Sequence, residues 1–319
     1  MTGGGRLVVV GSMNLDLTVR TTVLPQPGST VLGSDICRSP GGKSSNQAAV
    51  AALMGADVSL VAAVGSDPEG HELISQAQNT GIDTTHVRVI PSATTGVALI
   101  AVDDAAENLI IVSPGANTQL TSEHVRSSLE AITEVSAVSL CLEIPLDVVR
   151  DTVIAASAHG VTVILNLSPY SEGAAFLAAM ADLVIVNEHE AAKLCGIDSL
   201  LDISDGELSE KLDQLGVHRA VITLGAEGAL VIDSSAGPDR SPQRVPTPRV
   251  RAMDTTGCGD AFAGVIASEI AAGAELVSAA RTAAGVAAYA AQYAGAQPSY
   301  PTRDRFNAWL SDREGGSHL

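Results

Sequence analysis

Short apolar segments alternate with longer alanine-rich segments along most of this 319-residue chain. The apolar segments have the length of buried strands, and the alanine-rich segments, several of which end at a glycine, have the length of helices. This alternation predicts an α/β fold, in which helices cover both faces of a mostly parallel central sheet. Ligands of such sheets bind at the carboxyl ends of the strands. We expect strands at Leu7–Gly11, Val58–Val64, Val138–Leu142, Thr162–Asn166, Leu183–Val186 and Ala220–Thr223, and helices at Ser45–Met54 and Pro68–Thr80.

Two segments interrupt the alternation. In the first, Leu15–Arg20 and Thr30–Arg38 flank a turn rich in proline and glycine; in the second, Thr95–Asp103 and Asn108–Ser113 flank a polar turn. Both patterns predict β-hairpins without crossover helices. We therefore expect one α/β domain over residues 1–319, with a small antiparallel β lid made from inserted segments at about 15–40 and 95–114. A lid suits a reaction that must exclude water, whereas two hairpins without a role would leave their position unexplained.

The composition excludes several classes of protein. Hydrophobic residues make up 46% of the chain and charged residues 17%, which is typical of a globular protein and not of a disordered one. The formal net charge of −18 repels a nucleic-acid backbone. No apolar run approaches the 18 or so residues that a membrane span requires. We expect neither a nucleic-acid partner nor a membrane partner.

The four cysteines, Cys37, Cys141, Cys195 and Cys258, are scattered and include no Cys-x-x-Cys pair. This spacing favours free thiols in a reducing compartment over a zinc site or a disulfide framework. The first apolar run is too short for the core of a signal peptide and fits a buried strand. We therefore expect a cytoplasmic protein.

The strongest local motif is Asp-Thr-Thr-Gly-Cys-Gly-Asp, from Asp254 to Asp260, which an apolar helix-forming run follows. Its glycines, Gly257 and Gly259, let the backbone turn tightly and bring several N–H groups to one point. The positive end of the following helix dipole also attracts an anion. In a chain with so few cations, this motif predicts the place that holds a transferring phosphoryl group.

Asp260 has two interpretations at the mouth of that motif. An aspartate at a helix start commonly caps the helix. Beside amides that hold a phosphate, it is also suited to act as a general base that accepts the proton of an attacking hydroxyl. The motif alone does not separate the two interpretations, and the other motifs of the chain favour the base.

A second glycine-rich motif, Gly-Gly-Lys-Ser-Ser-Asn, runs from Gly41 to Asn46 and also opens a predicted helix. Lys43 is one of only three lysines, and with Asn46 it offers donors to hydroxyl or phosphate groups. The alternative is a strand–helix turn with an exposed lysine. The motif is not a P-loop, because the Gly-x-x-x-x-Gly-Lys-[Ser/Thr] pattern is absent.

Two further motifs follow predicted strands. Asn14 and Asp16 fall on one face of the chain by alternation, so both side chains can contact neighbouring hydroxyls of a polyol; the alternative is an Asx turn. Asn187 and Glu190 share a helical face, where they can orient hydrated Mg²⁺ and phosphate oxygens. By itself, that second motif is better explained as an acidic helix start.

Together and in this order, the motifs resemble the ribokinase family of carbohydrate and nucleoside kinases, also called the PfkB family. The resemblance runs from about Val8 to about Ser299, and Gly-Gly-Lys and Asp-Thr-Thr-Gly-x-Gly-Asp are both signatures of that family. It implies a ribokinase-like three-layer sandwich with a small antiparallel lid. It also implies ATP-dependent phosphorylation of D-ribose at O5, giving ribose 5-phosphate, with Mg²⁺ and an activating K⁺.

The resemblance implies roles for individual residues. Asp260 matches the base that deprotonates the sugar O5 hydroxyl, and the anion hole for the γ-phosphate matches Gly257, Cys258 and Gly259. The positions that match sugar contacts are Asn14, Asp16, Gly42, Lys43, Asn46 and Glu143. The positions that match ATP contacts are Asn187, Gly259 and the turn from Thr223 through Gly225 to Gly228.

Cations and assembly are implied in the same way. Glu190 matches an acidic residue associated with Mg²⁺ and phosphate. The positions that match a monovalent-cation site are Asp254, Thr256, Ala290, Tyr293, Gly295 and Ser299. Family members of this type pair their lids, so the resemblance also implies a homodimer.

The chain departs from the family pattern at three positions. Ser44 and Ser45 replace the usual Gly-Ala after Gly-Gly-Lys, and their hydroxyls can tighten the turn or change contacts to the sugar. Ala284 stands where an asparagine often approaches the adenine.

Other acceptors stay open, namely deoxyribose, fructose or a nucleoside such as adenosine, and so does a sugar-binding protein without catalysis. The first aromatic residue is Tyr170, so neither lid segment offers a ring for base stacking. Such stacking contributes about 1–3 kcal/mol per base elsewhere, and its absence favours a bare sugar, although Leu, Met and Ile side chains can also enclose a base.

Overall fold

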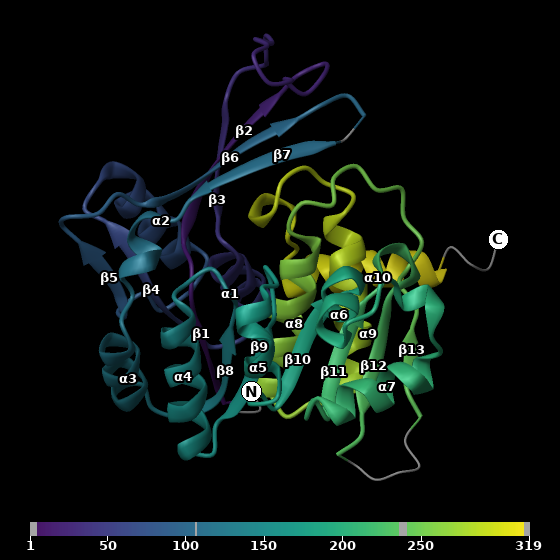
Figure 1. The fold of residues 1–319 in the computed structure, drawn as a ribbon. Helices are drawn as coiled ribbons and strands as arrows, with labels where there is room; N and C mark the ends of the chain where they lie inside the picture. Colours follow the sequence, from purple (N-terminus) through teal and green to yellow (C-terminus); the bar gives the residue numbers. More distant parts are fainter. Residues whose placement is uncertain (1–4, 106, 236–240, 316–319) are drawn as a thin grey trace.

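The computed structural model describes residues 5–105, 107–235 and 241–315. In this described part, a nine-stranded sheet lies between two layers of helices (Figure 1), in the strand order β13-β12-β11-β10-β9-β8-β1-β4-β5. Each strand from β11 to β5 pairs in parallel with its neighbour, and β12 and β13 continue the sheet with antiparallel pairing. The strands are β1 (Arg6–Val10), β4 (Val58–Gly65), β5 (Val87–Ile90), β8 (Val135–Leu140), β9 (Thr162–Asn166), β10 (Leu183–Asn187), β11 (Arg219–Thr223), β12 (Ala229–Asp233) and β13 (Gln243–Val245).

Apolar side chains fill both faces of this sheet, as a mostly parallel sheet requires. Along β1, Leu7 and Val9 join one buried cluster, whereas Val8 and Val10 join the other. The first cluster is covered by α1 (Lys43–Leu53), α2 (Pro68–Asn79), α8 (Cys258–Ala271), α9 (Leu276–Ala290) and α10 (Arg303–Gly315). The second is covered by α3 (Ser122–Ala131), α4 (Leu146–Ala158), α5 (Ala175–Ala178), α6 (Glu188–Cys195) and α7 (Asp205–Gln214). The predicted α/β three-layer fold is confirmed.

A second, four-stranded sheet rises from one end of the main body (Figure 1). Its strands, in spatial order, are β3 (Cys37–Gly41), β2 (Asn14–Arg20), β6 (Gly96–Val102) and β7 (Asn108–Ser113). The two outer pairs, β2–β3 and β6–β7, are antiparallel, and β2 and β6 pair in parallel at the centre. These strands come from the two segments that interrupt the alternation in the sequence.

One strand boundary in this sheet was predicted wrongly. The strand expected at Thr30–Arg38 begins only at Cys37 and ends at Gly41, where Gly41 pairs with Asn14. The preceding residues form a loop that meets the end of β2 through a bridge between Thr21 and Gly33 and through hydrogen bonds between Ser34 and Arg20. Leu32 in that loop is 93% exposed, so its apolar side chain gains no packing that would hold a longer strand.

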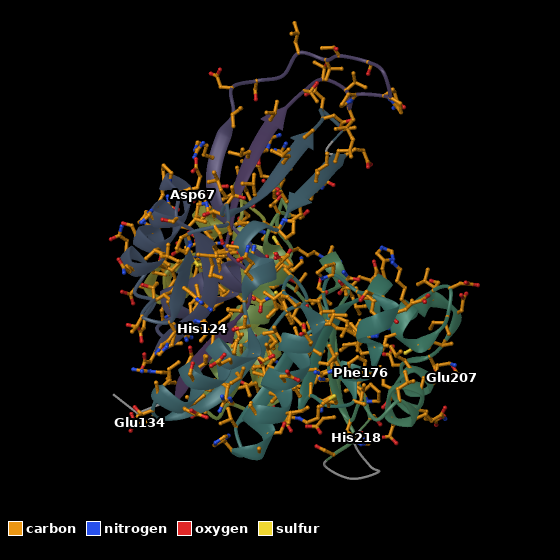
Figure 2. All side chains as sticks on the ribbon, turned by 60° about the vertical axis from the view of Figure 1, so that its left-hand side comes forward. Asp67, His124, Glu134, Phe176, Glu207 and His218 are labelled. Carbon is orange, nitrogen blue, oxygen red and sulfur yellow. The ribbon has the colours of Figure 1, made fainter. Side chains whose placement is uncertain are left out.

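Asp67 joins this second sheet to the body and is labelled near their junction in Figure 2. Its carboxylate caps α2 by accepting a hydrogen bond from the Gly70 amide and accepts another, of 2.7 Å, from the Thr95 amide just before β6. The Thr95 hydroxyl in turn accepts from the Gly65 amide at the end of β4. The start of β6 is therefore tied to the carboxyl end of β4.

Within the described residues, no helix is long and apolar enough to cross a membrane.

Candidate active site

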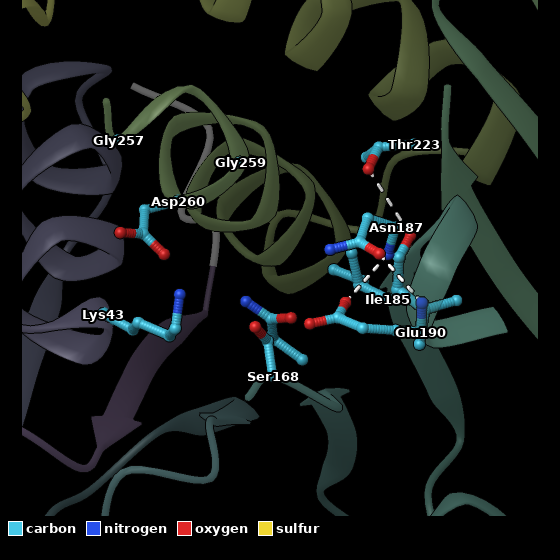
Figure 3. A pocket seen from close by; sticks show the side chains of 11 residues that line it. Lys43, Ser168, Ile185, Asn187, Glu190, Thr223, Gly257, Gly259 and Asp260 are labelled. Carbon is cyan, nitrogen blue, oxygen red and sulfur yellow. Dashed lines mark hydrogen bonds between the residues drawn. The ribbon is translucent and has the colours of Figure 1, made fainter. Parts of the chain in front are cut away.

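A cavity of about 140 Å³ lies at the carboxyl ends of β9, β10 and β11, opposite the amino terminus of α8 (Figure 3). This is the edge at which ligands bind in parallel sheets. The residues around it come from distant parts of the sequence and include Lys43, Asn187, Glu190, Thr223, Gly259 and Asp260.

Gly257, the N-cap residue just before α8, has a conformation that suits an anion site. Its φ of 74° lies in the left-handed region, and a Cβ at this position would overlap Ala296 and the Tyr300 hydroxyl. The Tyr300 hydroxyl donates a 2.9 Å hydrogen bond to the Gly257 carbonyl and fixes the turn. No described side chain caps the helix, so the positive end of its dipole faces the cavity. Of its first amides, that of Cys258 donates a 3.2 Å hydrogen bond to the Thr255 carbonyl.

Asp260 does not cap α8, because the capping position belongs to Gly257. Its buried carboxylate instead accepts a 2.9 Å hydrogen bond from Asn46 Nδ2, and Figure 3 shows it on the same side of the cavity as Lys43, opposite Asn187 and Glu190. Burial raises the pKa of Asp260, while Lys43 and Asn46 act in the opposite direction. In turn, the negative charge of Asp260 raises the pKa of Lys43 despite its burial. The helix-cap interpretation of Asp260 is therefore wrong.

The predicted sugar-contacting residues are brought together beside Asp260. Glu143, just after β8, accepts hydrogen bonds from the Lys43 amide at 2.9 Å and from the Ser12 hydroxyl at 2.6 Å through one carboxylate oxygen, Oε2. Asp16 lies close to Gly41, where a Cβ would overlap its carboxylate. Burial, followed by the negative charges of Glu143 and Asp260, raises the pKa of Asp16 to about 7, and Lys43 only partly offsets this.

Two other predicted positions complete this group. Gly42, with φ of 88°, lets α1 begin against the turn after β1, because a Cβ there would crowd backbone atoms of residues 12–14. Asn14 is buried, and its Oδ1 accepts a 2.7 Å hydrogen bond from Asn117 Nδ2.

Several residues of the site escaped the sequence analysis. Asn117 holds Asn14 and also accepts from the Met13 amide, and Ser12 holds Glu143. Gln297 donates to Asn46 Oδ1. These contacts join residues 103 to 251 positions apart, and no local pattern marks their partners.

Asn187 and Glu190 form a capping box at the start of α6 (Figure 3). Asn187 Oδ1 accepts from the Glu190 amide, and Glu190 Oε2 accepts from the Asn187 amide, both at 2.9 Å. The helix-start interpretation is thus confirmed, yet both residues also line the cavity. The capping bonds use one oxygen of each side chain and leave Asn187 Nδ2 and Glu190 Oε1 for a ligand.

A second cavity of about 120 Å³ shares Thr223 and Gly259 with the first. Its wall includes the predicted nucleotide turn at Gly225 and Gly228 together with Phe262 and Ala284. Gly228 has φ of 98°, and a Cβ there would overlap the Val245 carbonyl. The small Ala284 side chain leaves the space open, and the largely apolar wall suits a flat heterocycle next to the anion site.

The predicted monovalent-cation residues come from the loop before α8 and from the segment between the end of α9 and η5 (Gln297–Ser299), and Asp254 connects the two. Its carboxylate accepts 2.9 Å hydrogen bonds from the Thr256 amide and from the Gly295 amide. Partial burial would raise the pKa of Asp254, but these amides hold it below its ordinary value, so the carboxylate stays charged. Ala290, Tyr293 and Ser299 lie in the same region, where the Ala290 carbonyl accepts from the Tyr293 amide. A charged carboxylate with unused lone pairs fits a monovalent cation.

The family model described as pfkB family carbohydrate kinase matches residues 5–303. The chain belongs to this family. It is 35% identical over 305 residues to the ribokinase of Schizosaccharomyces pombe, with 93% of this chain and 95% of that protein covered. It is 31% identical over 311 residues to the deoxyribokinase of Salmonella typhi, with 97% and 99% covered. The structure of Arabidopsis thaliana ribokinase complexed with ribose and ATP superimposes with a TM-score of 0.84 at 28% identity, covering 97% of this chain and 99% of that one.

Family membership makes this chain a phosphotransferase that acts on a carbohydrate and uses ATP. The resemblance inferred from the two glycine-rich motifs is thereby confirmed.

Proposed function

We propose that the chain transfers the γ-phosphoryl group of ATP to O5 of D-ribose and produces ribose 5-phosphate and ADP. The observation that carries this proposal is the position of Asp260. It lies in the first turn of α8, whose start no described side chain caps, and lines the cavity together with Lys43 and Gly259. A base and an anion site therefore face the same space, as a direct phosphoryl transfer requires.

In the proposed reaction, Asp260 takes the proton of the sugar O5 hydroxyl while O5 forms a bond to the γ-phosphorus. The bond between that phosphorus and the β,γ-bridging oxygen breaks, and ADP leaves. The turn at Gly257, Cys258 and Gly259 and the positive end of the α8 dipole stabilise charge on the transferring group, although the Cys258 amide donates to the Thr255 carbonyl in this structure. Burial supports the role of Asp260, because a raised pKa makes the carboxylate a stronger base near neutral pH.

The sugar side of the site is crowded with hydrogen-bond acceptors. Asp16, Glu143 and Asp260 are close enough to influence one another's charge, and Lys43 is the cation among them. Carboxylates only accept hydrogen bonds, so they favour a ligand that carries several O–H donors, as a free sugar does. Neither lid segment contains an aromatic ring for a nucleoside base. We therefore favour a bare sugar over a nucleoside, with deoxyribose as the closest alternative.

Two cations belong to the proposal. Mg²⁺ is usually held by one or two carboxylates and the substrate phosphates, and the open oxygen of Glu190 fits that role beside Asn187. Among the described residues, no group of three or more His, Cys, Asp or Glu side chains is arranged to hold a metal by itself. K⁺ would be held at Asp254 and Thr256, with Ala290, Tyr293, Gly295 and Ser299. There it would supply positive charge behind the anion site.

We also propose a homodimer that forms through the second sheet, acting as a lid. Its edge strand β7 exposes four consecutive aliphatic side chains, Leu109, Ile110, Ile111 and Val112, by 45–62%. Alternation directs two of them to each face of the sheet, so one pair can cover the substrate while the other packs on a partner.

All four cysteines carry free thiols, which supports a cytoplasmic enzyme.

The test is to measure ATP-dependent turnover with ribose, deoxyribose, fructose and adenosine, for the wild type and for Asp260→Asn. We expect the highest kcat/KM with ribose and a 10²- to 10⁴-fold lower kcat in the variant, roughly the loss typical of a missing general base. Near wild-type turnover by Asp260→Asn would refute the mechanism. A preference for another acceptor would refute the substrate assignment alone.

A further inference from the structure

A short chain of side-chain hydrogen bonds ends on the Asp260 carboxylate. Asn46 Nδ2 donates to Asp260 Oδ2 at 2.9 Å. On its other side, Asn46 Oδ1 accepts from Gln297 Nε2 at 3.1 Å, and the same nitrogen donates to the Ser45 hydroxyl at 3.1 Å. Gln297 begins the short helix η5 (Gln297–Ser299), so it reaches α1 only in the folded protein.

The two ends of an asparagine amide have nearly the same shape and opposite hydrogen-bonding character. If the amide of Asn46 were reversed, its oxygen would face the oxygen of Asp260 and the carboxylate would lose a donor. Gln297 Nε2 is only a donor, so it pairs with Asn46 Oδ1 and leaves Nδ2 for Asp260. Ser45 occupies the second hydrogen of the same nitrogen and thereby fixes the orientation of Gln297.

Burial makes this arrangement hard to replace. Asn46 is 5% exposed, Ser45 is 3% exposed and Asp260 is 8% exposed, while Gln297 is half-buried, so water has limited access to take over a lost contact. When a buried polar group loses its hydrogen-bond partner, the free energy that was spent on removing the group from water is no longer compensated.

We propose that Gln297 is a positioning residue that sets the orientation of the Asn46 amide and, through it, holds Asp260 ready to accept the proton. This role rests on the proposed function of Asp260 as the base. Gln297 touches no reacting atom in this scheme and acts only through Asn46.

Two substitutions distinguish orientation from simple packing. Gln297→Met keeps the length of the side chain and removes its donors, and we expect about a tenfold lower kcat with the KM for ATP unchanged. Gln297→Glu offers only acceptors, so it attracts Asn46 Nδ2 and turns the amide oxygen toward Asp260. We expect this variant to lose about 100-fold in kcat, again without a change in the KM for ATP.

The same pair of substitutions in an Asn46→Ala background tests whether the effect passes through the amide. In the Asn46→Ala background, we expect Gln297→Met and Gln297→Glu to have equal kcat values. If the added charge acted directly on Asp260, the two kcat values would still differ. Gln78→Met is the matched control. Gln78 lies near the carboxyl end of α2, and its Nε2 donates a 2.9 Å hydrogen bond to the Thr84 hydroxyl. The Gln78→Met variant should keep wild-type kcat.

Gln297→Asn, which is too short to reach Asn46, repeats the test if the methionine variant does not fold, and it should also lose about tenfold. Wild-type kcat in the folded Gln297 variants, or a persistent difference between them without Asn46, would overturn the positioning role while leaving the proposed function intact. A wild-type protein that phosphorylates no sugar would overturn both.

Discussion

Replacing Asp16 by asparagine should raise the stability of the protein at neutral and higher pH while it weakens sugar binding. In the free enzyme, the pKa of Asp16 is raised from 3.8 to about 7 by burial and by the neighbouring charges of Glu143 and Asp260. Between these two values the folded protein holds a proton that the unfolded chain has released. Stability therefore falls as the pH rises from about 4 to about 7, and the whole penalty is present above 7.

The size of the penalty follows from the shift. A difference of about 3 pKa units at 1.36 kcal/mol per unit corresponds to about 4 kcal/mol at pH 8, and to less than half of that at pH 5. An asparagine has no charge to bury. With an unfolding entropy of about 0.7 kcal/mol/K for a chain of this length, Asp16→Asn should raise Tm by about 6 °C at pH 8.

The assay is thermal unfolding of the wild type and the variant, without ligand, at pH 5 and pH 8. Asp35→Asn, an exposed aspartate in the same lid, is the control and should change Tm at neither pH. Turnover measurements should show the KM for the sugar raised about 10- to 100-fold in Asp16→Asn, since hydrogen bonds to a charged group are lost. An equal Tm for wild type and variant at pH 8, or the same increase at both pH values, would refute the electrostatic reasoning.

Two further predictions concern the cation site and the lid. Turnover of the wild type should be higher in KCl than in tetramethylammonium chloride. Asp254→Ala should abolish that difference and lower kcat at least about tenfold. Equal wild-type rates in the two salts would refute the K⁺ proposal. Ile111→Asp, at a side chain 62% exposed on β7, should convert a dimer into a monomer at micromolar concentration in sedimentation experiments, whereas Leu201→Asp, 96% exposed on the main body, should not. A wild-type monomer would contradict the lid interface.

The periodic pattern of the sequence was enough to predict the central sheet. The strand at Thr162–Asn166 was predicted to the residue, because its apolar centre, Val163–Leu165, lies between two polar residues and fits a strand buried on both faces. The first lid hairpin was harder, because residue 30 and residues 32–36 are exposed and have little to pack against. Local residue preferences cannot set the register of a strand that lacks a buried face.

The candidate site likewise contains residues that a local motif marks and residues whose roles come from contacts distant in sequence. Asp260, Lys43 and Glu190 could be predicted because each lies in a motif beside glycines or at a helix start, where the local backbone dictates the residue type. Asn117 and Gln297 could not be predicted, because each owes its role to a partner more than 100 residues away in sequence. Only the packing of the lid base and of the C-terminal loop against α1 and β2 creates those contacts.

The two serines that depart from the family pattern turn inward, which bears on the choice of substrate. The Ser44 hydroxyl lies 2.9 Å from the Cys141 sulfur and 3.4 Å from the Val10 carbonyl, and Ser44 is fully buried. The Ser45 hydroxyl accepts from Gln297. Both hydroxyls therefore already have hydrogen-bond partners within the protein. The departure therefore changes how α1 is anchored beneath the site, and it gives no reason to expect an acceptor other than the small sugars on which the proposed function rests.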